Sequence, residues 1–253
     1  MLNITPIPAF SDNYLWIISD SKTHVAAIID PGDANPVIRY LQNHNLSLEY
    51  IVLTHHHNDH IAGIAQLVKQ YSPKVFGNQR SAGEFLDIDI SHKNSINLEK
   101  LQLDLNVLHT PGHTSDHVVY FNNQHLFCGD TLFAAGCGRL FEGTHVEMFH
   151  SLQKLTKLPA QTKIYCAHEY TLQNLNFACS ILPNNQDIQT RRQQVKDLRE
   201  QNKITLPSTI EIELATNPFL MCINPATQAQ FKEFNIADPV ELFGHIRKLK
   251  DKF

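Results

Sequence analysis

The amino-acid sequence predicts an α/β domain followed by an all-helical region. Apolar runs of strand length alternate with helix-like segments over the first part of the chain. After residue 170 the segments read as helices, and no strong strand pattern follows. The 253 residues suffice for one large domain or for a domain with a smaller appendage. We therefore predict a division into residues 1–170 and residues 171–253.

The first half of the chain mixes strands with helices. Strands are predicted at residues 14–20, 24–30, 49–53 and 74–78. A helix is expected to begin with Asn35 as its N-cap and Pro36 in its first position. A second helix is expected over residues 61–71. Residues 79–100 are polar and loosely patterned, and we therefore place them at the surface.

The second half begins with strands and ends with helices. Strands are predicted at residues 105–110, 117–121 and 125–130, with a last strand at 162–170. Helices are predicted at residues 146–156, 171–182, 187–201 and 238–253. The change of character near residue 170 marks the predicted boundary between the two domains.

Composition excludes several broad classes of protein. The net charge is −4 and the pI is about 6.4, which argues against a general nucleic-acid binder. The N-terminal residues do not form a signal peptide, and no apolar run reaches the length of a membrane span. The five cysteines include no CxxC pair, so we interpret them as reduced thiols in a cytoplasmic protein.

Residues 54–60 read THHHNDH and lie between a predicted strand and a predicted helix. Metal binding requires several imidazoles, whereas packing and solubility do not. Side chains alternate faces in an extended segment, so His55 and His57 point one way and His56 points the other. Asp59 and His60 follow where the chain turns into the helix, and both can face back toward the strand end. The alternative interpretation is a solvated polar loop.

Three later residues of metal-ligand type occupy the same kind of position. His113 follows the strand NVL, Asp130 ends the strand HLFCGD, and His168 ends the strand KIYCAH. Open α/β sheets place their sites in loops at the carboxyl ends of strands. We therefore predict one metal site at the edge of a sheet. Asp30 either caps a turn or supports the metal ligands from behind.

Four motifs identify a superfamily. THHHNDH, TPGHT, CGDTLF and CAHEY, in this order, resemble the metallo-β-lactamase superfamily. More narrowly, AGCGRLFEGT, AHEYTLQNLNFA, NPFL and RKLKDKF are similar to hydroxyacylglutathione hydrolases, also called glyoxalase II. The likeness extends from the first strands to the last residue. It implies an α/β fold of the four-layer αββα type, the metallo-β-lactamase sandwich, with a C-terminal all-helical domain.

The resemblance also implies two metal ions and their ligands. One metal would be held by His55, His57 and His113, the other by Asp59, His60 and His168, with Asp130 bridging both. Asp59 and Asp130 would then be the catalytic carboxylates, acting with a hydroxide between the metals. Five imidazoles and two carboxylates suit zinc, iron and manganese, and we expect zinc.

The activity implied is hydrolysis of S-D-lactoylglutathione, and of related 2-hydroxyacyl thioesters, to glutathione and D-lactate. A thiol has a pKa of about 8.5, so a thiolate leaves with little help near neutral pH. The resemblance places the contacts with anionic glutathione at Arg139, Phe141, Tyr170, Arg247 and Lys250. Many family members have tyrosine in place of Phe141, so one hydroxyl contact is expected to be missing. For the terminal basic residues, a solvated helix face is the alternative.

Rival functions share parts of this pattern. A glutathione persulfide dioxygenase carries a similar metal loop but would lack the helical tail. A secreted β-lactamase would need a signal peptide, and a ribonuclease would need a basic path for RNA. A non-catalytic metal-binding protein is the alternative from a different class. We expect a monomeric enzyme that acts on a small molecule and binds neither nucleic acid nor membrane.

Overall fold

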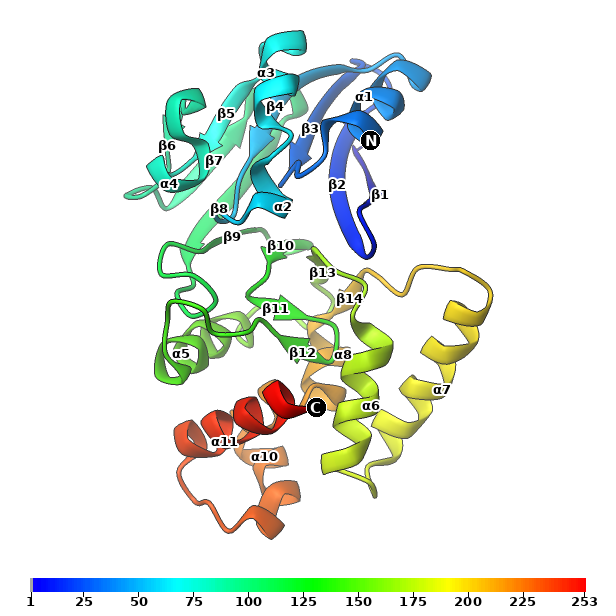
Figure 1. The fold of residues 1–253 in the computed structure, drawn as a ribbon, viewed down its shortest axis with the longest axis vertical. Helices are drawn as coiled ribbons and strands as arrows, with labels where there is room; N and C mark the ends of the chain where they lie inside the picture. Colours follow the sequence, from blue (N-terminus) through cyan, green and yellow to red (C-terminus); the bar gives the residue numbers. More distant parts are fainter. Residues whose placement is uncertain (1) are drawn as a thin grey trace. The chain divides into compact units, whose positions relative to one another are not determined.

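The computed structural model describes residues 2–253 and divides them into two compact units (Figure 1). The first unit runs to His109 and also includes Val118–Asn122. The second unit consists of Thr110–His117 and Asn123–Phe253. These units are defined by contacts within each unit, and they do not test the predicted domain boundary at residue 170, which stays a prediction.

The first unit contains a mixed six-stranded sheet with the strand order β1-β2-β3-β4-β5-β6. Its strands are β1 (Leu2–Ala9), β2 (Asn13–Asp20), β3 (Val25–Ile29), β4 (Ser47–Val52), β5 (Lys74–Gly77) and β6 (Ile88–Asp89). Strands β1 to β3 are antiparallel neighbours, whereas β3 to β6 pair in parallel. The four strands predicted in this region are confirmed. Strand β1 was not predicted, because Pro6 and Pro8 are tolerated only at a sheet edge such as this one.

Helices α1 (Ala34–Asn43) and α3 (Ile64–Tyr71) pack together on this sheet (Figure 1). Val37 and Leu41 are four residues apart in α1, so they share one helix face, and both are buried. Ile64 and Leu67 of α3 join the same apolar core, together with residues of β2 to β5. Burial of each such side chain stabilises the fold by about 1.5–3 kcal/mol.

Two helix predictions require correction. The N-cap of α1 is Asp33, whose carboxylate accepts a hydrogen bond from the Asn35 N–H at 2.9 Å, so Asn35 lies inside the first turn. The helix predicted over residues 61–71 is divided into α2 (Asn58–Ile61) and α3. The division arises because the Gly63 N–H donates to the Pro31 carbonyl at 2.9 Å instead of continuing the helix.

Three more strands of the first unit are antiparallel neighbours: β7 (Ser95–Leu98), β8 (Leu103–His109) and β9 (Val118–Phe121). Strands β8 and β9 confirm the strands predicted at residues 105–110 and 117–121, whereas β7 corrects the prediction that residues 79–100 are a polar surface segment. That segment contains α4 (Gln79–Ala82), β6, β7 and two 3-10 turns, and Ile96 and Leu98 are buried. Strands of two to four residues are too short to produce a clear sequence period.

The second unit contains three paired strands and a small hairpin. Strand β10 (His125–Gly129) runs parallel to β13 (Lys163–Cys166), and β14 (Ser208–Thr209) is antiparallel to β13. The hairpin consists of β11 (Leu132–Phe133) and β12 (Gly136–Cys137). The last predicted strand therefore ends at Cys166, four residues before Tyr170. After residue 170 the only strand in the described residues is the two-residue β14, which is consistent with the expectation that no strong strand follows.

Helices make up most of the second unit. They are α5 (His145–Leu155), α6 (Thr171–Ile181), α7 (Gln186–Glu200), α8 (Ile210–Thr216), α9 (Pro218–Met221), α10 (Pro225–Gln228) and α11 (Pro239–Lys252), with a 3-10 turn at Ala229–Phe234. Helices α5, α6, α7 and α11 confirm predictions, whereas α8 to α10 are additions. Helix α6 packs against α7, and α11 packs against α5 (Figure 1). The Phe243 ring of α11 lies edge-on to Phe149 and Phe219, at 6.0 and 5.5 Å between centroids.

Within residues 2–253, no helix is both long enough and apolar enough to cross a membrane. None of the five cysteines forms a disulfide. Burial raises the pKa of the Cys137 thiol to about 11, and it raises that of Cys128 well above its usual value. These two side chains are therefore protonated thiols at neutral pH, in agreement with the sequence interpretation.

Candidate metal centre and adjoining pocket

The THHHNDH loop leaves the end of β4 and enters α2. The rings of His55 and His57 are 4.8 Å apart, and those of His55 and His60 are 4.1 Å apart, between centroids. His55 and His60 are buried, and His57 is partly exposed. The His56 ring also meets the His57 ring edge-on, at 5.3 Å between centroids, but its Nε2 lies 3.1 Å from the Arg80 guanidinium. The structure thus brings His55, His57 and His60 together, while the Nε2 of His56 faces Arg80.

Asp59 lies in the first turn of α2, next to His60. Its Oδ2 is 3.4 Å from Nε2 of His60 and accepts a hydrogen bond from the Asn13 amide at 3.0 Å. A glycine is required nearby, because a Cβ on Gly32 would lie 1.8 Å from the Asp59 carbonyl oxygen. Asn13 was not identified from the sequence, since it precedes Asp59 by 46 residues and belongs to another strand.

Asp30 is the common acceptor beneath this loop. Its Oδ1 accepts the Thr54 N–H and its Oδ2 accepts the Thr54 hydroxyl, both at 2.7 Å. The same Oδ2 lies 3.1 Å from Nδ1 of His60. One ligand-type atom from each of Asp30, His55 and His60 lies within 4.8 Å of the others. Of the two roles considered for Asp30, these contacts favour support of the metal ligands.

The second unit brings together His113, Asp130 and His168. The Asp130 Oδ2 is 3.4 Å from Nε2 of His113, and its Oδ1 is 3.5 Å from Nε2 of His168. All three residues are buried. The Asp130 N–H donates to Nε2 of His117 at 3.1 Å, and a Cβ on Gly138 would lie 2.0 Å from the Asp130 carbonyl oxygen. Each carboxylate oxygen of Asp130 therefore faces one histidine.

The hydrogen bonds of two histidines indicate which ring nitrogen carries the proton. Nδ1 of His113 lies 2.8 Å from the Arg139 carbonyl, which can only accept, so Nε2 presents its lone pair to Asp130. Nδ1 of His60 likewise donates to the Asp30 carboxylate. In the neutral imidazole this lone pair faces a carboxylate oxygen, an arrangement that a metal cation bound between the two atoms would stabilise. The donor set therefore fits divalent metal ions.

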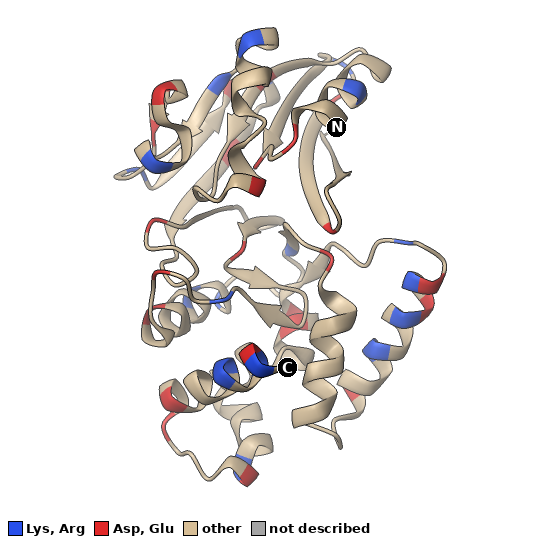
Figure 2. Cartoon of the chain, viewed as in Figure 1, with Lys and Arg blue, Asp and Glu red and all other residues tan. Residues whose placement is uncertain are grey.

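A cavity of about 370 Å³ lies beside His113 and Asp130 in the second unit. Its lining includes all five predicted glutathione contacts, which are Arg139, Phe141, Tyr170, Arg247 and Lys250. Figure 2 shows basic residues close together near the end of α11, beside the C-terminus. Three cationic side chains in one cavity suit a ligand with more than one carboxylate.

Arg247 is held by contacts on both ends of its guanidinium. Its Nη1 donates to the Cys137 carbonyl at 3.0 Å, and its Nη2 is 2.9 Å from the Asp251 carboxylate. The guanidinium carbon lies 5.0 Å from the centroid of the Phe219 ring. Asp251 also lies 3.6 Å from Nε of Arg139, so one carboxylate contacts two arginines of the cavity. Sequence analysis did not identify Asp251, although its i,i+4 spacing from Arg247 was available as a signal.

Lys250 is half-buried between two aromatic rings. Its ammonium lies 5.3 Å from the Phe177 centroid and 5.1 Å from the Phe253 centroid. Burial, and secondarily the charge of Arg247, lowers the pKa of Lys250 to about 8. Its charge therefore changes within a pH range accessible to experiment.

Aromatic rings connect His168, a residue of metal-ligand type, with the cavity. The Tyr170 ring stacks on the His168 ring at 4.7 Å and 4°. The Phe133 ring meets both edge-on, at 5.8 Å from His168 and 5.3 Å from Tyr170. Phe141 lies edge-on to His113 at 5.3 Å and is 62% exposed. Phe133 was not singled out in the sequence, where it appears as an ordinary apolar residue.

Comparisons with known proteins cover the whole chain. The profile of the metallo-beta-lactamase superfamily matches residues 13–168, and that of the hydroxyacylglutathione hydrolase C-terminus matches residues 169–253. A hydroxyacylglutathione hydrolase of Nitrosomonas europaea is 44% identical over 256 residues, covering 100% of this chain and 97% of the relative. One of Shewanella baltica is 45% identical over 264 residues, covering 100% of both chains.

A solved structure extends the comparison to the fold. The crystal structure of the B3 metallo-beta-lactamase BLEG-1 is similar with a TM-score of 0.62 and 24% identity, covering 87% of this chain and 99% of that one. The chain therefore has the metallo-β-lactamase fold, with a C-terminal helical region added to it. The superfamily and the His/Asp clusters together indicate divalent-metal binding. By its full-length similarity, the chain belongs to the hydroxyacylglutathione hydrolase family.

Proposed function

We propose that this chain hydrolyses S-D-lactoylglutathione, and related S-2-hydroxyacylglutathiones, to glutathione and the free hydroxy acid. Similarity of about 44% over full-length relatives of that name supports the proposal. The observation that carries it is the cation-lined cavity beside His113 and Asp130. Two proposed metal ligands, His113 and Asp130, therefore lie directly beside a cavity that could bind anionic glutathione.

We propose that seven side chains hold two divalent cations, with zinc as the expected metal. They are His55, His57, Asp59, His60, His113, Asp130 and His168. When bound, such cations activate water and stabilise negative charge on an acyl oxygen. Each carboxylate oxygen of Asp130 lies next to one histidine, so Asp130 could provide a ligand atom beside His113 and another beside His168. Elemental analysis of protein purified without added metal would identify the metal.

The supporting residues hold the ligand side chains in the required orientation. Asp30 accepts a hydrogen bond from Nδ1 of His60, and the Arg139 carbonyl accepts one from Nδ1 of His113. In the neutral imidazole, both rings then present an unprotonated Nε2 that can act as a metal ligand. The Asn13 amide donates to Oδ2 of Asp59 and thereby holds this carboxylate next to Nε2 of His60.

The pocket residues bind and orient the glutathione moiety. Glutathione carries two carboxylates and one ammonium, so Arg139, Arg247 and Lys250 complement its net negative charge. The buried Arg247 has few alternative rotamers, so little side-chain entropy is lost when it binds a carboxylate. The thiolate needs no dedicated proton donor, because its pKa lies near about 8.5. A strong dependence of the rate on leaving-group pKa would contradict this last point.

The direct test is the thioester assay. Purified protein is incubated with S-D-lactoylglutathione while thioester absorbance is followed, with and without a chelator. We expect turnover that the chelator abolishes and that added zinc, iron or manganese restores. Absence of turnover, together with oxygen uptake on glutathione persulfide, would instead identify a persulfide dioxygenase. Light scattering during the same preparation would test the expected monomeric state.

A further inference from the structure

We propose that Glu213 and Asn217 are positioning residues that hold the β11–β12 hairpin in the arrangement that the substrate pocket requires. Neither residue lines the cavity. Both are fully buried, and both contact the backbone of the hairpin. The inference rests on the proposed function, because it concerns the binding of the glutathione moiety in that pocket.

The hairpin joins the proposed metal ligands to the pocket. It begins at Leu132, two residues after Asp130, and ends at Cys137, two residues before Arg139. Its Phe133 ring meets the rings of His168 and Tyr170 edge-on. Its Cys137 carbonyl accepts the hydrogen bond from Arg247. A shift of the hairpin would therefore displace the Phe133 ring, which lines the pocket, and the Cys137 carbonyl, which holds Arg247.

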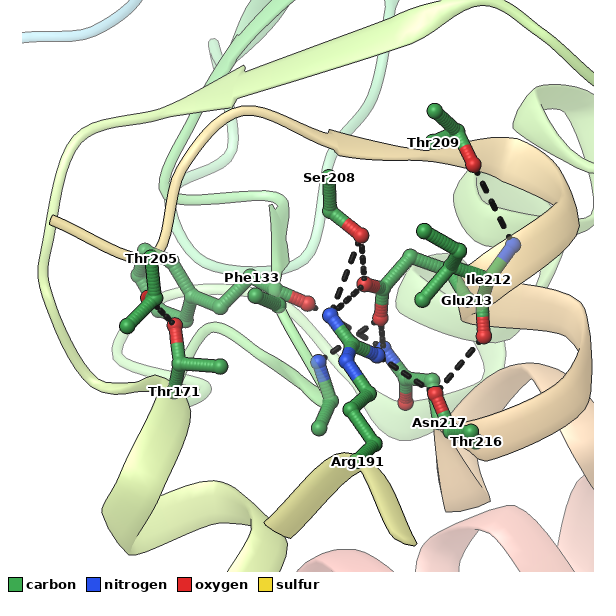
Figure 3. A network of polar contacts seen from close by, with 12 residues as sticks. Phe133, Thr171, Arg191, Thr205, Ser208, Thr209, Ile212, Glu213, Thr216 and Asn217 are labelled. Carbon is green, nitrogen blue, oxygen red and sulfur yellow. Dashed lines mark hydrogen bonds and ion pairs between the residues drawn. The ribbon is translucent and has the colours of Figure 1, made fainter. Parts of the chain in front are cut away.

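Side chains from three helical segments hold the four residues of the hairpin tip. Figure 3 shows two of these side chains, Glu213 and Asn217, together with Phe133 of the hairpin. The Asn217 amide donates to the carbonyls of Phe133 and Gly136, at 3.1 and 2.9 Å. The Ala135 N–H donates to Oε2 of Glu213 at 2.7 Å. The Asn174 amide donates to the Ala134 carbonyl at 3.0 Å. Every residue from 133 to 136 thus has a side-chain partner outside the hairpin.

The conformation of the tip explains why such anchors are needed. Ala135 has φ +56°, in the left-handed region that residues with a Cβ rarely adopt. Two strands of two residues each also form too few ladder hydrogen bonds to fix their own geometry. The surrounding helices must therefore stabilise this conformation.

The Glu213 carboxylate is itself fixed on its other side. Its Oε1 lies 2.6 Å from Nη2 of Arg191 and also accepts the Ser208 hydroxyl. The buried charge is thereby paired and hydrogen-bonded. The Thr216 hydroxyl completes this side by contacting Arg191 and by donating to the Ile212 carbonyl at 2.6 Å. Thr216 belongs to the same network, but its hydrogen bonds run to Arg191 and Ile212 and not to the hairpin (Figure 3).

The neighbouring residues Thr216 and Asn217 provide a matched pair of variants. Asn217→Ser retains a hydroxyl that can accept the Phe219 N–H, as Asn217 Oδ1 does, but it cannot reach both hairpin carbonyls. Thr216→Val removes hydrogen bonds from the same network on the side away from the hairpin. Glu213→Gln is a second variant that keeps the side-chain shape. Thermal unfolding would establish how far each variant is destabilised.

Three measurements on the metal-loaded full-length chain distinguish positioning from simple stabilisation. We expect Asn217→Ser to raise KM for the thioester about tenfold, with less change in kcat. The Kd for S-methylglutathione, which cannot be hydrolysed, should rise in parallel. Amide hydrogen exchange in residues 131–138 should accelerate. Thr216→Val should leave the KM, the Kd and the exchange rate of residues 131–138 within about twofold of the wild-type values.

Each outcome decides the inference. If the two variants, at equal loss of unfolding temperature, show the same KM, Kd and hairpin exchange, the network is merely structural and the inference is wrong. If Asn217→Ser does not fold, Glu213→Gln is compared with Thr216→Val by the same criteria. A wild type without thioesterase activity would refute the proposed function, whereas the Kd and exchange measurements would still decide positioning.

Discussion

In each unit the acidic metal-ligand candidate packs against a glycine. The candidates of the first unit are close together in the sequence, whereas those of the second are far apart. A glycine packs on the carbonyl of each carboxylate residue, Gly32 on Asp59 and Gly138 on Asp130. The candidate ligands of the first unit come from the single loop at residues 54–60. Those of the second unit come from strand ends spread over residues 113–168.

The supports behind the ligands differ as well. In the first unit, the charged carboxylate of Asp30 accepts hydrogen bonds from Thr54 and faces His60. In the second unit, the supports are neutral, namely His117 behind Asp130 and a backbone carbonyl behind His113. The second unit also contains the cation-lined cavity. Under the proposed function, the first unit would contribute only metal ligands, whereas the second would contribute metal ligands and also bind substrate.

The largest effect is expected from removal of the charge behind the first-unit ligands. Asp30→Asn replaces one acceptor oxygen by a donor, so His60 and Thr54 lose part of their support. Metal affinity should fall about 10- to 100-fold, and activity at limiting metal should fall with it. Titration with metal buffers would measure this. Asp33→Asn, which changes the N-cap of α1 in the same loop, is the control and should bind metal normally. If Asp30→Asn raised the KM for the thioester while metal affinity stayed normal, the proposal that the first unit contributes only to metal binding would be wrong.

The second effect belongs to the pocket. Arg247→Ala removes a guanidinium that lines the cavity and bonds to the Cys137 carbonyl. KM for the thioester should rise about 10- to 100-fold, because one charge-assisted contact is lost, while metal content stays unchanged. Lys248→Ala is the matched control, since Lys248 is exposed on the same helix and outside this cavity. An unchanged KM for Arg247→Ala would remove this residue from the site.

A pH titration would separate Lys250 from the arginines. Its pKa is lowered to about 8, and a lysine is cationic below its pKa and neutral above it. Affinity for the anionic substrate should therefore weaken as the pH rises through about 8, so that KM increases severalfold between about pH 7 and about pH 9. Cys137, whose pKa is raised to about 11, stays neutral over this range.

The variant Lys250→Met should show a high KM that no longer varies in this interval. Lys252→Met, a change two residues further along the same helix, should retain the wild-type profile. If the profile of Lys250→Met matched that of the wild type, another group would be responsible for the pH dependence.

The smallest effect is expected at the position where this chain differs from many family members. Phe141 lines the cavity, and its exposed ring lies edge-on to His113. Phe141→Tyr should add one hydroxyl contact and lower KM about twofold to fivefold. Steady-state kinetics at constant metal content would measure the change. A KM that does not fall would mean that the added hydroxyl stays in water.

Sequence reasoning succeeded where the signal is local. The THHHNDH loop gathers His55, His57 and His60 because strand alternation and the turn into α2 act over only a few residues. Long helices such as α7 and α11 were predicted from their length and pattern. The two-residue strands and the hairpin were missed, because so few residues carry no period.

The amino-acid sequence by itself determined the family, the ligand-type residues at the strand ends and the basic character of the last helix. Only the tertiary structure decided which distant groups support them. Asn13 meets Asp59 across 46 residues, and Asn217 meets Phe133 across 84. The physical reason is that a buried polar group must find a hydrogen-bond partner wherever the folded chain supplies one, and local sequence patterns do not specify that partner.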